Sequence, residues 1–352
     1  MNDDISGVFS LFFDGVPKTV QNIDTSHGDG DFRAAFIVEA DTGEKYVIKL
    51  AENDFTVPER IGVWQRTAAE YRKLGYYAPV IHGDKTGSFP AVEYHGHRCV
   101  AYAEDFAPFR PAEDRMKGDG AANAALYQSY QHDVWRMTAR IAELHLNYTD
   151  LPSAWCLFDT FCPSDKTDEV LENALLWKEY ADTLPDEFKP QVEKIWRLWK
   201  DNRAALEAVY QSLPASVFQA DLNPTNILLD DGGRFVGVYD FNLCGREVFL
   251  NYLMRENYSG FQKEVSMICD ALRIAGEYYH YCDAEKNAAL PLYRCLKPLS
   301  FISLETLKEA ENDKRAVKAV LDETENALTA PIDFKGCMEQ CGGKLSGAVC
   351  IP

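Results

Sequence analysis

The sequence has no long apolar run and no excess of positive charge. No segment approaches the roughly 18 consecutive apolar residues that a membrane-spanning helix needs. The N-terminus, Met1–Asp4, is acidic and lacks a cationic stretch followed by an apolar core, so the pattern does not predict a secretory signal. We therefore expect a cytoplasmic protein that does not bind membranes.

The charge balance is strongly acidic. The chain of 352 residues carries 36 Lys and Arg against 55 Asp and Glu, a formal net charge of −19. Because phosphate groups are bound through a basic surface, this balance excludes nucleic acid as the main partner. An acidic surface promotes solubility and also suits a cationic small substrate, and the sequence leaves both explanations open.

The chain has no CxxC motif. Most of its ten cysteines stand singly among apolar residues, where a thiol acts as a small hydrophobe. With no secretory signal we expect free thiols rather than disulfides. The cluster of Cys337, Cys341 and Cys350 has no histidine nearby, and the pair His95 and His97 lacks a third ligand, so neither predicts a metal site.

The length suggests about two domains. The run Phe32–Ala40 followed by the alternating Lys45–Ala51 predicts a β-hairpin, and Pro58 begins a helix to about Leu74. Short strands are expected at 78–82, 89–94 and 98–103, and helices at 126–144, 168–181, 187–213, 260–279, 284–296 and 304–328. The order predicts an α+β chain with a small antiparallel β lobe holding one helix, residues 1–104, and a larger mainly helical lobe, residues 105–352. A ligand is expected between the two lobes.

The most informative stretch is an apolar strand that enters a polar loop and leaves as a second strand. Asp221 and Asn226 stand five apart on either side of Pro224, and Asp240 ends a further strand fourteen residues later. A tight turn at 230–233 joins the two strands, so we expect Asn226 and Asp240 to lie close together. Carboxylate and amide oxygens suit Mg²⁺, and Asp221 would lie near a substrate hydroxyl.

This stretch resembles the protein-kinase-like fold, specifically its aminoglycoside phosphotransferase and choline kinase branch. The family loop reads H-x-D-x-x-x-x-N followed by a strand-ending D, and here Gln219 stands in place of the histidine before Asp221. The resemblance implies that Asp221 is the catalytic base. It also implies that Asn226 and Asp240 hold Mg²⁺ against the phosphates of ATP or GTP.

The first hundred residues match the same family in order. Lys49 is a strand lysine of the V-A-I-K type, expected on the phosphates, and Glu70 on the next helix would pair with it. The turn with Gly28 and Gly30 would cover the phosphates, and the backbone at Ala103 would contact the base at the hinge. These residues are the nucleotide-binding set that the resemblance implies.

The departures from the family pattern decide between functions. A glutamine amide can donate and accept hydrogen bonds, so we expect Gln219 to support the loop and activity to survive. The missing A-P-E segment argues against a protein kinase. The sequence thus predicts a kinase that transfers the γ-phosphate of ATP or GTP to a hydroxyl of a small acceptor, and the acidic charge favours an amine-bearing one. Gln219 and the sparse glycines motivate an alternative, a pseudokinase or nucleotide-binding regulatory protein, and no pattern indicates the oligomeric state.

Overall fold

The computed structural model describes residues 3–24, 30–116, 120–148, 157–158, 168–256 and 265–339. Contacts divide the chain into two units, one made of 1–133 with 219–244 and the other of 134–218 with 245–352. This division differs from the expected boundary after residue 104. Residues 105–133 and the segment that carries Asp221, Asn226 and Asp240 belong with the β-rich unit.

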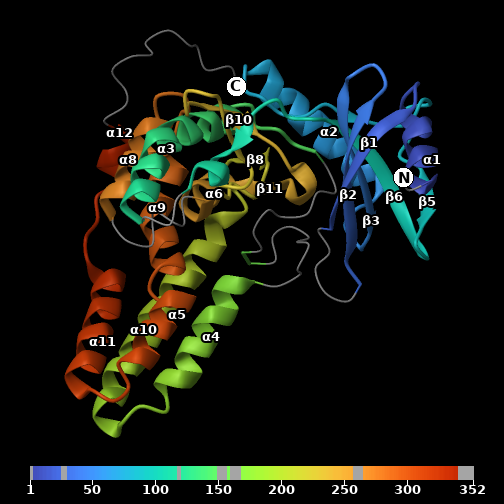
Figure 1. Ribbon diagram of the computed structural model, residues 1–352. Coiled ribbons are helices and arrows are strands. Elements are labelled where there is room, and N and C mark those ends of the chain that lie inside the picture. The colour runs from blue at the N-terminus through green and yellow to red at the C-terminus, as the bar shows by residue number, and fades with distance from the viewer. Residues whose placement is uncertain are drawn as a thin grey trace. The chain divides into compact units, whose positions relative to one another are not determined.

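The β-rich unit is built on an antiparallel sheet with the strand order β1–β2–β3–β6–β4, and β5 also pairs with β6 (Figure 1). The expected hairpin is confirmed, because β2 (Phe32–Ala40) and β3 (Lys45–Glu52) pair in register through a turn at 41–44. The other strands are β1 (Pro17–Asp24), β4 (Ile81–His82), β5 (Ala91–Tyr94) and β6 (His97–Asp105). The strand β1 was not predicted from the sequence.

Two α-helices lie wholly within this unit, where the sequence predicted one. The unpredicted helix α1 (Asp3–Phe12) places Ile5, Phe9 and Phe12 in a core with one face of the sheet. On that face β3 contributes Ile48 and Leu50, so the alternation of a strand turns Lys49 to the opposite face. Helix α2 (Pro58–Lys73) begins and ends as predicted, with Gly75 at a φ of +89° after its last turn.

A small second sheet attaches the hairpin of β9 and β10 to this unit. Its order is β10 (Phe235–Val238), β9 (Ile227–Leu229) and β7 (Arg110–Pro111). Tyr77 also bonds this hairpin, donating from its N to the O of Val236 at 2.8 Å and accepting from the N of Val238 at 3.0 Å. A Cβ on Gly237 would stand 2.1 Å from the Tyr77 carbonyl oxygen, so only glycine permits this approach. The short 3-10 helix η1 (Ala112–Arg115) follows β7 in sequence, and η3 (Phe241–Leu243) follows β10.

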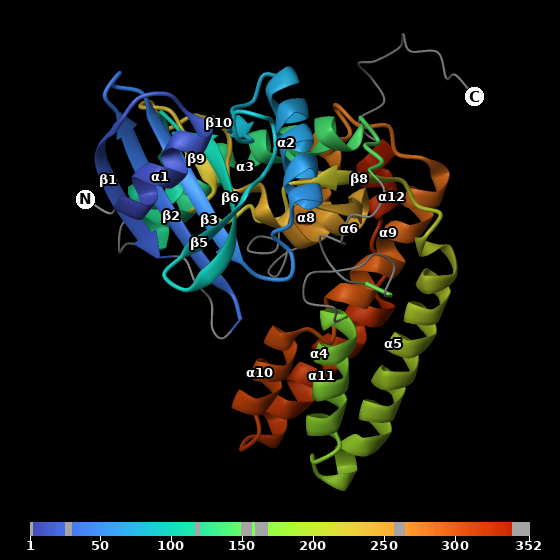
Figure 2. The same ribbon diagram turned by 90° about the vertical axis from the view of Figure 1, so that its right-hand side faces the viewer.

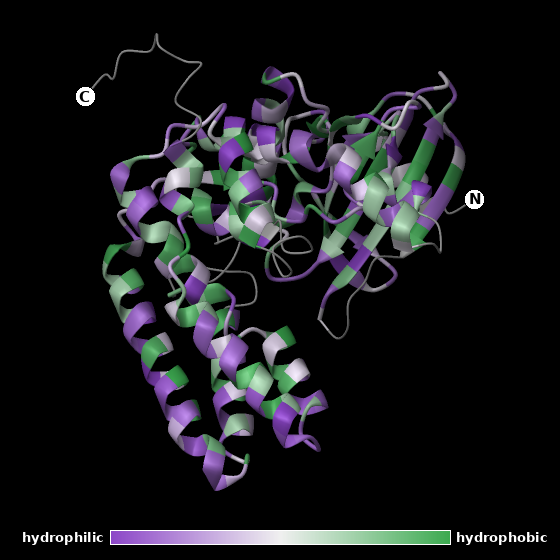
Figure 3. Ribbon diagram, turned by 90° about the vertical axis from the view of Figure 1, so that its left-hand side faces the viewer, coloured by the Kyte–Doolittle hydropathy of each residue, from purple (hydrophilic) through white to green (hydrophobic). Residues whose placement is uncertain are grey.

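The other unit is mainly helical. Helix α3 (Gly120–Ala142) runs across the division between the units, and the strands β8 (Ala215–Phe218) and β11 (Gly245–Val248) pair antiparallel. Helices α4, α5, α10 and α11 lie side by side in both views (Figures 1 and 2) and show bands of hydrophobic and hydrophilic residues (Figure 3). The remaining helix bounds are α4 (Glu169–Ala181), α5 (Lys189–Tyr210) after η2 (Asp186–Phe188), α6 (Phe249–Glu256), α8 (Val265–Ala275), α9 (Asp283–Leu296), α10 (Phe301–Glu309), α11 (Lys314–Thr329) and α12 (Phe334–Glu339).

The single helix predicted at 304–328 is wrong. The structure has two helices there, α10 and α11, because the Asp313 carboxylate caps a new N-terminus by accepting from the backbone N of Arg315 at 2.8 Å. Aspartate and asparagine compete with helical hydrogen bonds through their own side chains, so the Asn312–Asp313 pair favours a break. The apolar periodicity continues through this break, which is why it indicated one helix.

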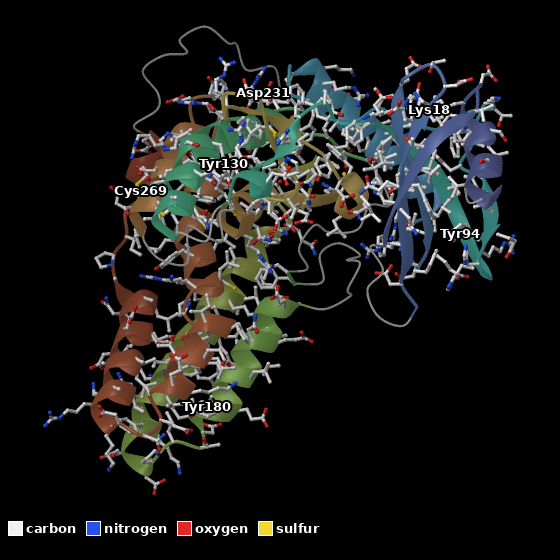
Figure 4. All side chains as sticks on the ribbon, viewed as in Figure 1. Lys18, Tyr94, Tyr130, Tyr180, Asp231 and Cys269 are labelled. Carbon is white, nitrogen blue, oxygen red and sulfur yellow. A yellow bond between two sulfur atoms is a disulfide. The ribbon has the colours of Figure 1, made fainter. Side chains whose placement is uncertain are left out.

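The expectation that the cysteines are free thiols is corrected at one pair. Cys269 in α8, labelled in Figure 4, is bonded to Cys337 in α12, because packing of these two helices brings the Cα atoms within 5.3 Å. Within the described ranges the free thiols are Cys99, Cys244, Cys282 and Cys295. The tail residues Cys341 and Cys350 lie outside the described residues. Among the helices that the structure describes, none is both long and apolar enough to cross a bilayer.

Candidate active site

Gln219 holds together the loop that carries Asp221. Its side chain is fully buried, and its Nε2 donates to the backbone oxygens of Asp221 at 2.8 Å, Tyr239 at 3.1 Å and Asp240 at 3.1 Å. Its Oε1 accepts from the backbone N of Asp221 at 3.0 Å. One amide therefore joins the start of the loop to the residues that end β10, and the expected hydrogen bonds of glutamine in this position are present.

Asp240 follows β10 in a left-handed backbone conformation, with a φ of 61°. A non-glycine residue adopts this region at a cost, and such residues cluster at functional sites. The next residue, Phe241, is buried and meets the Tyr71 ring of α2 edge-on at 5.2 Å. The Tyr71 Oη also accepts from the backbone N of Gln219 at 3.1 Å, so α2 helps to fix both segments.

Asp221 is oriented by two asparagines. The Nδ2 of Asn226 donates to its Oδ2 at 2.9 Å and to its backbone oxygen at 3.0 Å, and the Nδ2 of Asn223 donates to its Oδ1. Burial raises the pKa of Asp221, and the nearby charge of Asp240 raises it further. The result is a held carboxylate with a raised proton affinity, which suits a group that receives a proton.

Asn226 and Asp240 fit a magnesium site. They lie close because the backbone N of Tyr239 donates to the backbone O of Asn226 at 3.2 Å. Since the Nδ2 of Asn226 faces Asp221, its amide oxygen points to the other side, and Asp240 keeps 28% of its side chain exposed. In the described part of the chain no three His, Cys, Asp or Glu side chains gather into a metal site. A Mg²⁺ ion would thus take two oxygens from these residues and the rest from phosphates and water.

Lys49 extends from strand β3 of the sheet to the Asp240 carboxylate. Its Nζ lies 3.0 Å from the Oδ1 of Asp240 and 3.1 Å from the Oε2 of Glu104. Burial lowers the pKa of a lysine, but the charges of Asp240 and Glu104 outweigh it and hold the pKa of Lys49 well above its usual value. A fixed positive charge therefore stands beside the Asp240 carboxylate, and the two residues are 191 apart in sequence.

Two of the expected nucleotide contacts are corrected. Glu70 does not pair with Lys49, because its carboxylate bonds the Nζ of Lys73 one turn along α2 at 2.7 Å. Ala103 does not lie at a hinge where its backbone could bond the nucleotide base. It stands inside the sheet, paired with Ile48 on one side and His82 on the other. The strand β6 continues to Asp105, so the chain leaves the sheet later than predicted.

The glycine turn is partly described. Gly28 lies outside the described residues, while Gly30 is exposed and has a φ of +83°, which favours glycine. Beyond it, Arg33 bonds Asp31 in a two-pronged pair at 2.8 and 2.6 Å, and Asn53 donates to the same carboxylate at 2.9 Å. These bonds anchor the start of β2 to the end of β3.

The sequence reasoning missed Glu104 as the partner of Lys49. Glu104 is 4% exposed and follows the apolar run 99–103, and a buried glutamate in such a run is rare unless it is paired. The buried position of Glu104 could therefore have indicated that it has a cationic partner. Which cation it meets depends on the register between β3 and β6. Lys49 pairs opposite Tyr102, and Glu104 stands two residues further on the same face.

Comparisons with known proteins agree with this geometry. The family model described as "Phosphotransferase enzyme family" matches residues 26–249. Among solved structures, the chain is similar to an aminoglycoside phosphotransferase from Alicyclobacillus acidocaldarius, at 12% identity and a TM-score of 0.52 over 95% of each chain. It is also similar to a macrolide 2'-phosphotransferase from Brachybacterium faecium, at 13% identity and a TM-score of 0.47 over 94% of this chain and 97% of that one. A Plasmodium vivax ethanolamine kinase is 14% identical, with a TM-score of 0.44 over 90% of this chain and 84% of that one. No curated protein matches.

The predicted resemblance is therefore confirmed. The matched residues make up well over half of the chain and include Lys49, Asp221 and Asp240. The antiparallel sheet and the helical unit give the mixed α+β class that was expected. On this match the chain belongs to the phosphotransferase enzyme family, and it is a phosphotransferase with a kinase-like fold.

Proposed function

We propose that the protein transfers the γ-phosphate of ATP or GTP to a hydroxyl group of a small acceptor. The observation that carries the proposal is the contact of Lys49 with Asp240 in the same unit that holds Asp221 and Asn226. A cation, two metal-binding oxygens and a carboxylate base are the parts that phosphoryl transfer needs, because its catalysis depends on positioning and on neutralising charge.

Each side chain has a distinct task in this reaction. The Asp221 carboxylate orients the acceptor hydroxyl and receives its proton as that oxygen bonds the γ-phosphorus and the bond to the leaving diphosphate breaks. Lys49 holds the nucleotide phosphates through its positive charge. Mg²⁺ bound to the oxygens of Asn226 and Asp240 would neutralise charge on the phosphate oxygens.

Two backbone segments would contact the nucleotide. The turn with Gly28 and Gly30 would cover the phosphates, as the resemblance implies. Since Ala103 is enclosed by β3 and β4, and the N of Phe106 already donates to the O of Lys45 at 3.2 Å, the base would meet the backbone from Ala107 onward.

The acceptor is proposed to carry an amine. The net charge of −19 supports this choice, because an acidic protein attracts cationic substrates. A panel of small alcohols with and without an amine, each tested for nucleoside diphosphate release, decides the matter. Phosphorylation of neutral alcohols alone would overturn the amine assignment and leave the kinase assignment standing.

Thermal unfolding with ATP or GTP, each with and without Mg²⁺, tests the nucleotide assignment. A ligand at 100 times its Kd stabilises the folded state by about 2.7 kcal/mol, which raises Tm by about 4 °C for a protein of this size. We expect a Mg²⁺-dependent rise with at least one nucleotide, and its loss in the Asp240→Asn variant. A wild-type protein that shows no rise with either nucleotide and no transfer to any alcohol would overturn the proposal.

One of the two observations that favoured a pseudokinase or regulatory protein no longer supports it. It rested on Gln219 and on the sparse glycines, and Gln219 makes four hydrogen bonds that hold the loop. Measured transfer to an alcohol separates a kinase from a protein that only binds the nucleotide.

A further inference from the structure

Lys49 has two carboxylate partners, and both come from strands or strand ends. Glu104 is in β6 and Asp240 follows β10, and their oxygens lie 3.1 and 3.0 Å from the lysine Nζ. Glu70 in α2 is turned to Lys73 instead. The lysine is therefore held without any carboxylate from the helix that follows its strand.

Strand pairing fixes the contact between Lys49 and Glu104. Lys49 in β3 stands opposite Tyr102 in β6, and Glu104 two residues later lies on the same face as a diagonal neighbour. Glu104 is itself paired with Val47 on one side and Ile81 on the other, so its strand is enclosed by β3 and β4. The sheet therefore keeps the backbones of both residues in place on one face.

The two carboxylates differ in what else they can bind. Asp240 is 28% exposed at the side chain and belongs to the proposed metal site, whereas the Glu104 side chain is only 6% exposed. Burial raises the pKa of Glu104 despite the charge of Lys49, which shows how little solvent it meets. Glu104 thus contacts the Lys49 ammonium group and little solvent. Asp240 contacts the same ammonium group and is also open to the proposed metal ion.

We infer that Glu104, and not Glu70, is the positioning residue for Lys49. Glu104 keeps the lysine directed at the nucleotide phosphates when Asp240 turns to the metal, so this step does not depend on the placement of α2. The inference rests on the proposed function, because it assumes that Lys49 contacts a nucleotide and Asp240 a metal.

The test compares three charge-removing variants, Glu104→Gln, Glu70→Gln and Glu39→Gln. Glu39 is the matched control, because it lies in β2 of the same sheet and pairs with Lys18 and Lys45 at 3.6 and 3.7 Å. For each variant the Tm is measured at fixed ATP or GTP over a Mg²⁺ titration, and kcat and KM are measured separately.

We expect Glu104→Gln to raise the Mg²⁺ concentration at half-maximal stabilisation about tenfold, as loss of a supporting partner does at metal sites. With Glu104 neutral, Lys49 keeps only Asp240 and competes with the metal for it. The kcat should fall as well, while Glu70→Gln and Glu39→Gln stay within about twofold of the wild type. A purely structural role would lower Tm equally at every Mg²⁺ concentration.

Two results would overturn the inference alone. One is a Glu104→Gln variant whose Mg²⁺ requirement matches that of Glu39→Gln, and the other is a Glu70→Gln variant that shows the shift instead. A wild-type protein without any Mg²⁺-nucleotide response would instead overturn the proposed function and the inference with it.

A double variant covers the case in which Glu104→Gln does not fold. Adding Lys49→Met removes the lysine charge that has lost its buried partner Glu104, and a buried ion pair can be replaced by neutral side chains at little cost. We expect the double variant to recover the wild-type Tm. If it stays unfolded, Glu104 stabilises the fold independently of Lys49 and the inference is wrong.

Discussion

Replacing Gln219 by leucine should damage both the stability and the activity of this protein. The substitution keeps the approximate size but deletes four hydrogen bonds, three donated by Nε2 and one accepted by Oε1. Because the side chain is fully buried, water cannot replace these bonds. The carbonyl oxygens of Tyr239 and Asp240 and the N–H of Asp221 lose this partner, while the Asp221 oxygen keeps its bond from Asn226.

The size of the effect follows from the number of bonds. Each hydrogen bond contributes about 1 kcal/mol net, and the two protons of Nε2 are shared among three oxygens. With the bond to Oε1 the loss is therefore about 3 kcal/mol, less a small gain from burying an apolar side chain. A loss of about 3 kcal/mol lowers Tm by about 10 °C in a unit of this size. The kcat should fall in addition, because Asp221 and Asp240 are both bonded through their backbone to this amide.

Two variants control the experiment. Gln65 is a partly buried glutamine in the same unit with one such bond, from its Nε2 to the O of Ile81 at 2.7 Å. Gln65→Leu should therefore cost about 1 kcal/mol and about 3 °C. Gln219→His keeps one donor and one acceptor and should fall between the wild type and Gln219→Leu.

The measurements are thermal and urea unfolding followed by steady-state kinetics. A Gln219→Leu protein that unfolds like Gln65→Leu and turns over like the wild type would refute the reasoning. It would mean that the loop is held by the strands alone.

Three further predictions concern the site and the fold around it. The raised pKa of Asp221 means that the folded state holds its proton more tightly than the unfolded state, so the ionised carboxylate destabilises the fold at pH above its usual value of 3.8. Asp221→Asn should thus raise the urea midpoint at pH 7, an advantage that shrinks as the pH falls to 3.8, while kcat drops about 10²–10⁴-fold. Gly237→Ala should lower the free energy of unfolding by about 3 kcal/mol or more in urea titration, because its Cβ would stand 2.1 Å from the Tyr77 oxygen. Cys337→Ser should lower the free energy of unfolding by about 4 kcal/mol, which is the loop entropy of a bridge to Cys269 across 68 residues. A reductant should lower the free energy of unfolding of the wild type by the same amount and leave that of the variant unchanged.

Much of the β-rich unit could be predicted from local patterns. The hairpin of β2 and β3 and the bounds of α2 were predicted within a residue or two, because alternation, proline and glycine act over short distances. The helix α1 was missed although Ile5, Phe9 and Phe12 repeat at helical spacing.

The division of the chain could not be predicted in the same way. A boundary after residue 104 follows from a change in composition, but the units are defined by contacts between distant segments. The hairpin of β9 and β10 packs with β7 and Tyr77, more than a hundred residues earlier, and these pairings leave no mark in the local pattern.

The sequence by itself determined that three of the candidate site residues lie together. Asp221, Asn226 and Asp240 are separated by a short loop and a tight turn, so their proximity follows from local geometry and could be read from spacing. Tertiary structure alone decided which glutamate forms an ion pair with Lys49. That choice depends on the register between β3 and β6, and register is set by how two distant strands bury one common face, which no window of sequence contains.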